Sequence, residues 1–136
     1  MTNKVPLKSK NFHPFADLIG MKFTKVEPGY SKSELEIRED LLNPHGVLHG
    51  GVAYSMADTG MAAALVSMLE SGKSCTTIEL NIVYFRPATS GKLICETKVV
   101  RKGRTIGFIE AEISNNDRLI SKATGTFSII DLPSQA

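Results

Sequence analysis

The segment 52–69 constrains the fold most, because it is apolar on every side and carries a single charged residue, Asp58. Its composition predicts one long α-helix that is entered through Gly50 and Gly51 and ends at Gly72. A helix that is apolar nearly all round must be buried on nearly every side. We therefore expect this helix to lie at the centre of the molecule, with the other elements wrapped around it.

The remaining sequence predicts one short helix and six strands. Apolar residues at helical spacing favour a helix over residues 12–19, and after the long helix the apolar period changes from 3.6 to 2. The predicted strands, separated by glycine-, proline- and asparagine-bearing turns, are 22–27, 32–38, 75–85, 92–102, 105–115 and 119–130. Consecutive hairpins would make the last four strands a meander. The layout is α+β, and we expect a strongly curved antiparallel sheet around the helix, with a second subunit covering what remains exposed.

Length and charge limit the classes of function. The 136 residues, 42% of them hydrophobic, predict a single domain over 1–136 with an ordered core at about 12–130 and loosely held ends at 1–10 and 132–136. The formal net charge of +2, from 16 basic and 14 acidic residues, argues against a nucleic-acid partner. No apolar run follows the basic N-terminal residues, so we expect neither a signal peptide nor a membrane anchor, and a cytoplasmic location. Cys75 and Cys95 show no metal spacing and are expected to be reduced.

The residues before the long helix offer polar groups with several possible roles. Gly50 and Gly51 would leave backbone amides uncovered at a helix start, where a developing oxyanion can be stabilised by roughly 3–4 kcal/mol. Alternatively, they only permit a tight turn. His49 could orient this turn, bond a backbone carbonyl or transfer a proton. Asn43 could donate to a substrate carbonyl or hold the loop ahead of Pro44.

Asp58 lies about two turns inside the helix, where a capping role is excluded. It could be a buried carboxylate that is satisfied by a hydroxyl, an amide or a partner subunit. It could instead be a general base that acts on water, or a nucleophile. Thr77 could position that water, or it could be present only for its strand propensity.

Several other chemistries lack sequence support. The chain contains no Gly-x-Ser-x-Gly elbow, no Walker loop, no Rossmann glycine pattern and no HExxH motif. Its three histidines, at positions 13, 45 and 49, do not cluster with carboxylates at metal-ligand spacing. We therefore expect no metal site.

Two motifs resemble those of a known family. The first is Asn43-x-x-Gly46-x-x-His49-Gly50-Gly51 together with Asp58. The second is Thr77-Ile-Glu-Leu-Asn81-Ile-Val-Tyr84-Phe-Arg86-Pro87. Together they resemble the hotdog-fold acyl-CoA thioesterases of the phenylacetic-acid-pathway (PaaI-like) branch. The order of helix and strands agrees with that family from about residue 12 to residue 130. An aspartate at position 58, where relatives acting on hydroxybenzoyl- or dihydroxynaphthoyl-type thioesters often have glutamate, favours the aspartate branch.

The resemblance implies a role for each matching residue. The Gly50 amide would polarise the thioester carbonyl, with Asn43 helping to hold it and His49 shaping the turn. Asp58, from the other chain of a dimer, would act as base or nucleophile, and Thr77 would assist the water. Further residues expected to bind the substrate are Gly51 and, from charge alone, the CoA phosphate candidates Arg86, Lys102 and Arg104.

The implied protein is a homo-oligomer that acts on acyl- or aryl-CoA, with a dimer as its minimal unit and a tetramer as its expected form. No cofactor is expected, because coenzyme A is part of the substrate. Two alternatives on the same fold are a non-catalytic acyl-CoA-binding sensor or carrier and a dehydratase or hydratase. The hydrolase is favoured over the binder by the complete set of Asn43, His49-Gly50-Gly51, Asp58 and Thr77, because a binder needs no carboxylate beside the thioester.

Overall fold

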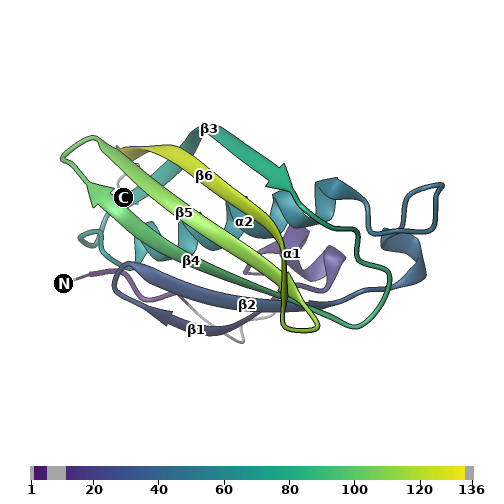
Figure 1. Cartoon of the computed structure of the whole chain (residues 1–136). Coiled ribbons are helices and arrows are strands. Elements are labelled where there is room, and N and C mark those ends of the chain that lie inside the picture. Colours follow the sequence, from purple (N-terminus) through teal and green to yellow (C-terminus); the bar gives the residue numbers. More distant parts are fainter. Residues whose placement is uncertain (1, 6–11, 134–136) are drawn as a thin grey trace.

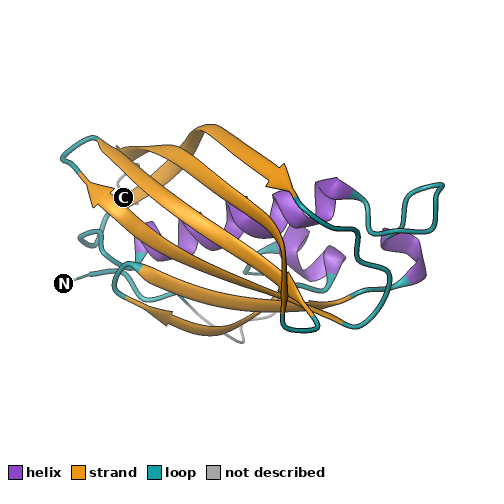
Figure 2. Cartoon of the chain, viewed as in Figure 1, coloured by secondary structure: helices purple, strands orange, loops and turns teal. Residues whose placement is uncertain are grey.

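One long helix packs against a six-stranded antiparallel sheet that curves around it (Figure 1). The computed structural model describes residues 2–5 and 12–133. The elements are α1 (Pro14–Ile19), β1 (Lys22–Glu27), β2 (Tyr30–Glu36), the 3-10 helix η1 (Glu39–Leu41), α2 (Gly50–Val66), β3 (Lys73–Tyr84), β4 (Lys92–Lys102), β5 (Ile106–Asn115) and β6 (Arg118–Asp131). Figure 2 shows the strands as one layer with the helices on one side of it. The predicted α+β hotdog fold is confirmed.

The order of strands in the sheet is β1-β2-β4-β5-β6-β3. Of the predicted four-strand meander, the pairings β4–β5 and β5–β6 are confirmed. The predicted pairing of β3 with β4 is wrong, because β3 pairs with β6 and β4 pairs with β2. Insertion of β4 beside β2 joins all strands into one sheet, which is wide enough to wrap around α2.

The side of α2 that faces the sheet is fully buried. Met56, Met61 and Leu65 have no exposed surface. At Gly60 the helix comes so close to β2 and β4 that a Cβ atom there would lie 2.9 Å from Cγ2 of Thr97. The Gly60 carbonyl accepts hydrogen bonds from the hydroxyls of Ser31 (2.8 Å) and Thr97 (3.0 Å). The small residue thus allows a close contact that these two hydroxyls complete.

The predicted end of the long helix at Gly72 is wrong, because α2 ends at Val66. The Ser67 hydroxyl lies 2.6 Å from the Ala64 carbonyl oxygen and 3.0 Å from the Glu27 carbonyl oxygen. It also accepts a hydrogen bond from the Gly29 amide. A side chain that binds nearby carbonyl groups competes with the helical ladder, and this contact ties the helix end to the β1–β2 turn.

The edge strand β3 changes its inward face partway along its length. A bulge between Thr77 and Glu79 leaves Ile78 unpaired. Before the bulge, Thr77 lies opposite the buried Phe127, and after it Tyr84 lies opposite the buried Ser121. A bulge inserts one residue and so shifts the alternation of side chains. The bulge therefore lets both Thr77 and Tyr84 face α2 although they are seven positions apart.

The outer edge of β3 is uncovered in the single chain. Ile78, Val83 and Phe85 are 54%, 56% and 53% exposed, respectively. A long, apolar edge strand of this kind is a template for pairing with another strand.

Asn3 ties the N-terminal part to the start of β3, since its side-chain amide donates to the carbonyls of Glu70 and Lys73. Positions 1, 6–11 and 134–136 of the segments predicted to be loosely held lie outside the described residues. Among the described residues, no helix is long and apolar enough to span a lipid bilayer.

Candidate active site

The loop before α2 folds back on itself and fixes the side chain of Asn43. Leu42 and Leu48 form an isolated bridge, and the Asn43 amide donates to the Val47 carbonyl at 2.7 Å. The Asn43 side-chain oxygen accepts from the backbone amides of His45 (2.9 Å) and Val47 (3.4 Å). Because that oxygen is used by the loop, the side-chain nitrogen remains available to donate.

His49 caps α2 rather than standing free beside it. Its Nδ1 accepts a hydrogen bond from the Gly51 amide at 2.8 Å, and its carbonyl accepts from the Val52 amide at 3.0 Å. The Gly50 amide has no acceptor among the residues that the structure describes. Of the two glycines, Gly50 therefore offers the free N–H at the positive end of the helix dipole.

Tyr84 packs against Gly50, a contact that sequence reasoning missed. The Tyr84 hydroxyl donates to the Gly50 carbonyl at 2.6 Å, and a Cβ atom on Gly50 would lie 3.0 Å from that ring. Burial, followed by the nearby Tyr54, raises the pKa of Tyr84. The signal available in the sequence was the position of Tyr84 at the end of the motif that begins at Thr77.

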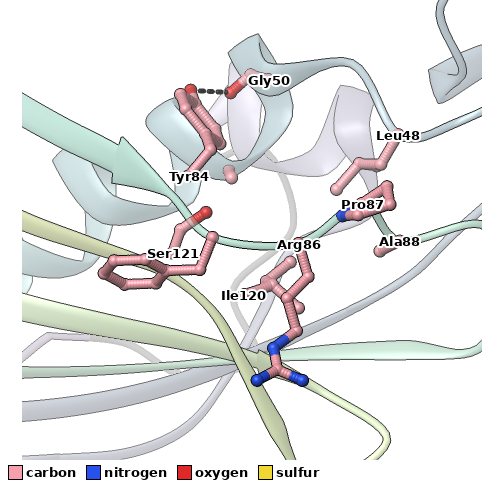
Figure 3. A pocket seen from close by; sticks show the side chains of 10 residues that line it. Leu48, Gly50, Tyr84, Arg86, Pro87, Ala88, Ile120 and Ser121 are labelled. Carbon is pink, nitrogen blue, oxygen red and sulfur yellow. Dashed lines mark hydrogen bonds between the residues drawn. The ribbon is translucent and has the colours of Figure 1, made fainter.

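A cavity of about 350 Å³ opens beside Gly50 and is largely apolar (Figure 3). Its lining residues are Leu48, Gly50, Ala53, Tyr84, Phe85, Arg86, Pro87, Ala88, Ile120 and Ser121. A second cavity of about 500 Å³ shares its Phe85–Ala88 wall and Ile120 and is also lined by Arg118. Neither Arg86 nor Arg118 pairs with a carboxylate among the described residues. The two cavities thus adjoin, and they lead from the largely apolar space beside Gly50 toward two unpaired guanidinium groups.

Asp58 and Thr77 meet on the other exposed part of α2. The Thr77 hydroxyl donates to Oδ1 of Asp58 at 2.6 Å. Asp58 is half-buried rather than fully buried, and it lies beside β3 at the edge of the sheet. Burial and then the charge of Asp58 raise the pKa of the neighbouring Cys75 thiol to about 11.

The two halves of the predicted site are separated within one chain. Gly50 and Asp58 are eight positions apart on α2, which is about 12 Å along the axis at about 1.5 Å per residue. A thioester group in contact with the Gly50 amide therefore lies out of reach of Asp58 of the same chain.

Lys102 and Arg104 lie at the β4–β5 turn, near the opposite end of α2 from Gly50 (Figure 1). A Cβ atom on Gly107, just after this turn, would lie 2.8 Å from Leu65 in the last turn of the helix. Of the three basic residues predicted to bind phosphate, one chain thus brings only Arg86 to the cavities. Arg118 joins it there and was not predicted, because only the folded β5–β6 turn brings it beside Arg86.

No group of three or more His, Cys, Asp or Glu side chains in the described part of the chain is arranged to hold a metal ion. The functional groups placed along α2 and its entry loop are a backbone amide, a side-chain amide, a hydroxyl and a carboxylate.

Comparisons with known proteins bear on the family to which this chain belongs. Residues 45–122 match the family model described as the thioesterase superfamily. A provisionally named esterase of Saccharolobus solfataricus is 32% identical over 114 residues, which are 83% of this chain and 75% of that protein. Human acyl-coenzyme A thioesterase 13 is 28% identical over 123 residues, which are 90% of this chain and 81% of that protein.

Among solved structures, a variant of the phenylacetic acid degradation protein PaaI from Thermus thermophilus is similar with a TM-score of 0.79 and 28% identity. The similarity covers 85% of this chain and 97% of that one. The family match spans the loop before α2, the helix itself and most of the sheet. The chain therefore belongs to the thioesterase superfamily and is a hotdog-fold thioester hydrolase of the PaaI-like branch.

Proposed function

We propose that the chain hydrolyses acyl- or aryl-CoA thioesters to a free acid and coenzyme A, at a site made by two copies of the chain. The observation that carries this proposal is the free Gly50 amide on the same helix as the Asp58–Thr77 pair but about 12 Å away from it. Each group suits one half of a thioester hydrolysis, and only a second copy can bring the halves together.

The Gly50 amide and the Asn43 side-chain nitrogen would donate to the thioester oxygen, which becomes an oxyanion during the reaction. Asp58 of the second copy would act as a general base, taking a proton from water as the water oxygen attacks the carbonyl carbon. The carbon–sulfur bond then breaks, and the proton passes to the leaving thiolate. Alternatively, the Asp58 carboxylate attacks the carbonyl carbon and expels the coenzyme A thiolate, which gives a mixed anhydride. Water then hydrolyses the anhydride, which releases the acid and restores the carboxylate, and the proton passes to the thiolate.

Thr77 supports the carboxylate in either route. Its hydroxyl donates to Oδ1 of Asp58, so Oδ2 is left to face the water or the thioester. His49 holds the turn by capping the Gly51 amide, which keeps the Gly50 amide pointed outward. The proposed reaction uses no cofactor and no metal.

The dimer would form by antiparallel pairing of two β3 strands around a two-fold axis. In such a pair the first half of one strand lies beside the second half of the other. Pairing centred near residues 80–81 would place Thr77 of one copy beside Tyr84 of the other, and so Asp58 beside the other copy's Gly50. The exposed side chains of Ile78 and Val83 would be covered by this pairing.

A tetramer would need a second surface on each dimer. Val100, Ile106 and Phe108 are exposed large apolar side chains near the β4–β5 turn. We propose that they contribute to this second contact.

Coenzyme A carries phosphate groups that require positive partners. The unpaired guanidinium groups of Arg86 and Arg118 line the cavity that adjoins the Gly50 cavity and would bind these phosphates. Cys75 and Cys95 are free thiols, which fits the reducing environment of the cytoplasm, where we place the enzyme.

Two substitutions at Gly50 test the proposed oxyanion contact. Gly50→Ala and Gly50→Pro both add a Cβ atom near Tyr84, but only proline removes the N–H. Proline is tolerated at the first helical position, and the extended backbone of His49 (φ −63°, ψ 132°) suits a following proline.

With acyl-CoA substrates and a thiol-trapping reagent, we expect Gly50→Pro to lower kcat about 10²–10³-fold below that of Gly50→Ala. Equal activity of the two variants would remove the Gly50 amide from the mechanism. Binding of acyl-CoA by the wild type without release of coenzyme A would instead point to the non-catalytic alternative.

A further inference from the structure

Two buried serine hydroxyls, those of Ser33 and Ser121, lack a hydrogen-bond partner among the described residues. Both side chains are fully buried. Buried hydroxyl groups almost always have a partner, because leaving one without a partner costs free energy. The position of each serine therefore requires an explanation.

Ser33 has a neighbour that explains its position in the core. It lies opposite Cys95 in the β2–β4 pair. Burial raises the pKa of Cys95 to about 12, and the adjacent Ser33 hydroxyl counteracts part of this rise. The thiol is a weak hydrogen-bonding group, and it gives the Ser33 hydroxyl a polarisable contact.

Ser121 has no such neighbour and lines the cavity beside Gly50. It lies on β6 opposite Tyr84, and Figure 3 shows its hydroxyl on the side of the strand that faces Tyr84 and the first turn of α2. The Tyr84 hydroxyl is already used by the Gly50 carbonyl. The guanidinium group of Arg86 points away from Gly50 in the same view. Of the side chains that line this cavity, Ser121 thus holds the uncommitted hydroxyl near Gly50.

We propose that Ser121 is a specificity-determining residue that hydrogen-bonds a polar group of the thioester substrate when the substrate fills this cavity. This inference rests on the proposed thioesterase function. The partner is a hydroxyl or amide close to the thioester carbon. Two parts of the substrate can supply it, namely a hydroxyl on the acyl or aryl group and an amide of the pantetheine arm of coenzyme A.

The test compares Ser121→Ala with the control Ser33→Ala. Both substitutions remove a fully buried serine hydroxyl, but only Ser121 lines the cavity. For a substrate that makes the contact, we expect Ser121→Ala to raise KM about 5-fold, the usual effect of one hydrogen bond, with little change in kcat. Ser33→Ala should keep the KM of the wild type. Because Ser121→Ala removes an unpartnered hydroxyl, its thermal midpoint without substrate should equal or exceed that of the wild type.

The choice of substrates identifies the source of the polar group. One pair of CoA thioesters differs only by a hydroxyl on the acyl group, and a second pair carries the same acyl groups on butanethiol, which has no amide. If the KM increase follows the acyl hydroxyl on both thiols, the acyl group supplies the contact. If it occurs with every CoA thioester and disappears with every butanethiol thioester, the pantetheine amide supplies it.

An unchanged KM of Ser121→Ala on all four substrates, with an active wild type, would overturn the inference alone. An inactive wild type would overturn the proposed function. Should Ser121→Ala fail to fold, Ser121→Cys keeps the side-chain size with a weaker donor, and its KM should lie above that of the wild type. A wild-type KM for folded Ser121→Cys would then count against the inference.

Discussion

The two sides of α2 use the same helix for different purposes. On the side that faces the sheet, Met61 is fully buried, and the Gly60 carbonyl receives hydroxyl groups from Ser31 and Thr97 of its own chain. On the other side, Asp58 is half-buried with one hydroxyl partner, and the adjacent edge of β3 is uncovered. A single chain thus buries its own core but leaves Asp58 and Thr77 accessible at the edge of the sheet. The difference supports the proposal that a second copy of the chain completes the active site.

The largest effect is expected on the accessible side, at Asp58. Asp58→Asn keeps the size of the side chain but removes its charge and its capacity to accept a proton. Loss of a general base typically lowers the rate about 10²–10⁴-fold, so kcat for CoA release should fall by that factor. Thermal unfolding should change little, because the carboxylate is only half-buried. Full activity of this variant would show that Asp58 is not the general base, and would contradict the catalytic role of this side of the helix.

A substitution on the side of α2 that faces the sheet should lower the free energy of unfolding rather than the activity. In Gly60→Val, the added Cβ would lie 2.9 Å from Thr97 Cγ2 and 3.3 Å from the Ser31 hydroxyl. Overpacking of a tight core usually costs about 1–3 kcal/mol, which urea unfolding would measure. The kcat per folded molecule should be retained. Unaltered stability together with a lost kcat would reverse the assignment of the two sides.

A smaller effect is expected at Thr77, which supports Asp58 through one hydrogen bond. Thr77→Val keeps the branched shape and removes the hydroxyl, and the loss of about 1 kcal/mol corresponds to a several-fold decrease in kcat. Thr77→Ser should restore most of the rate, because it returns the hydroxyl. If Thr77→Ser and Thr77→Val are equally slow, the methyl group rather than the hydroxyl is what matters.

The smallest effect distinguishes the two cysteines by pH. Burial and the charge of Asp58 raise the pKa of Cys75 to about 11, whereas burial raises that of Cys95, on the side where α2 faces the sheet, to about 12. Both thiols ionise at lower pH in the unfolded chain, so the free energy of unfolding should fall as the pH rises above about 9. Ultraviolet absorbance of the thiolate in single-cysteine variants should follow each titration.

Asp58→Asn provides the matched control for that titration. It removes a negative charge near Cys75 and should lower the Cys75 midpoint while leaving that of Cys95 unchanged. A shift of both midpoints, or of neither, would show that the charge of Asp58 does not raise the pKa of Cys75 selectively.

Local signals in the sequence were sufficient for the order of the elements and for the turn at which α2 begins. Strands 22–27 and 92–102 have the predicted bounds because alternating residues and turn residues mark their ends. The glycine turn identifies the start of α2, and the resemblance of the motif to a family adds Asp58 and Thr77. The contact between these two residues follows from the return of β3 alongside the helix.

Long-range contacts were the part that the sequence could not supply. The alternation of residues in β3 carries no information on whether its partner is β4 or β6. Tyr84 faces Gly50 because of the bulge at Ile78, and no local sequence pattern predicts this bulge. Arg118 reaches the cavity through a turn whose tip, Asn116 and Asp117, adopts positive φ angles of 53° and 62°. These features depend on the assembled sheet.

A mixed-dimer experiment tests most directly whether each site takes Gly50 from one copy and Asp58 from the other. Gly50→Pro and Asp58→Asn, each nearly inactive alone, are unfolded together and refolded at equal concentrations, and native mass spectrometry counts the mixed dimers. About half of the dimers should be mixed, each with one intact site of two, so about a quarter of wild-type CoA release should return. Mixed dimers that form in this proportion but release no more coenzyme A than the separate variants would contradict the two-copy site.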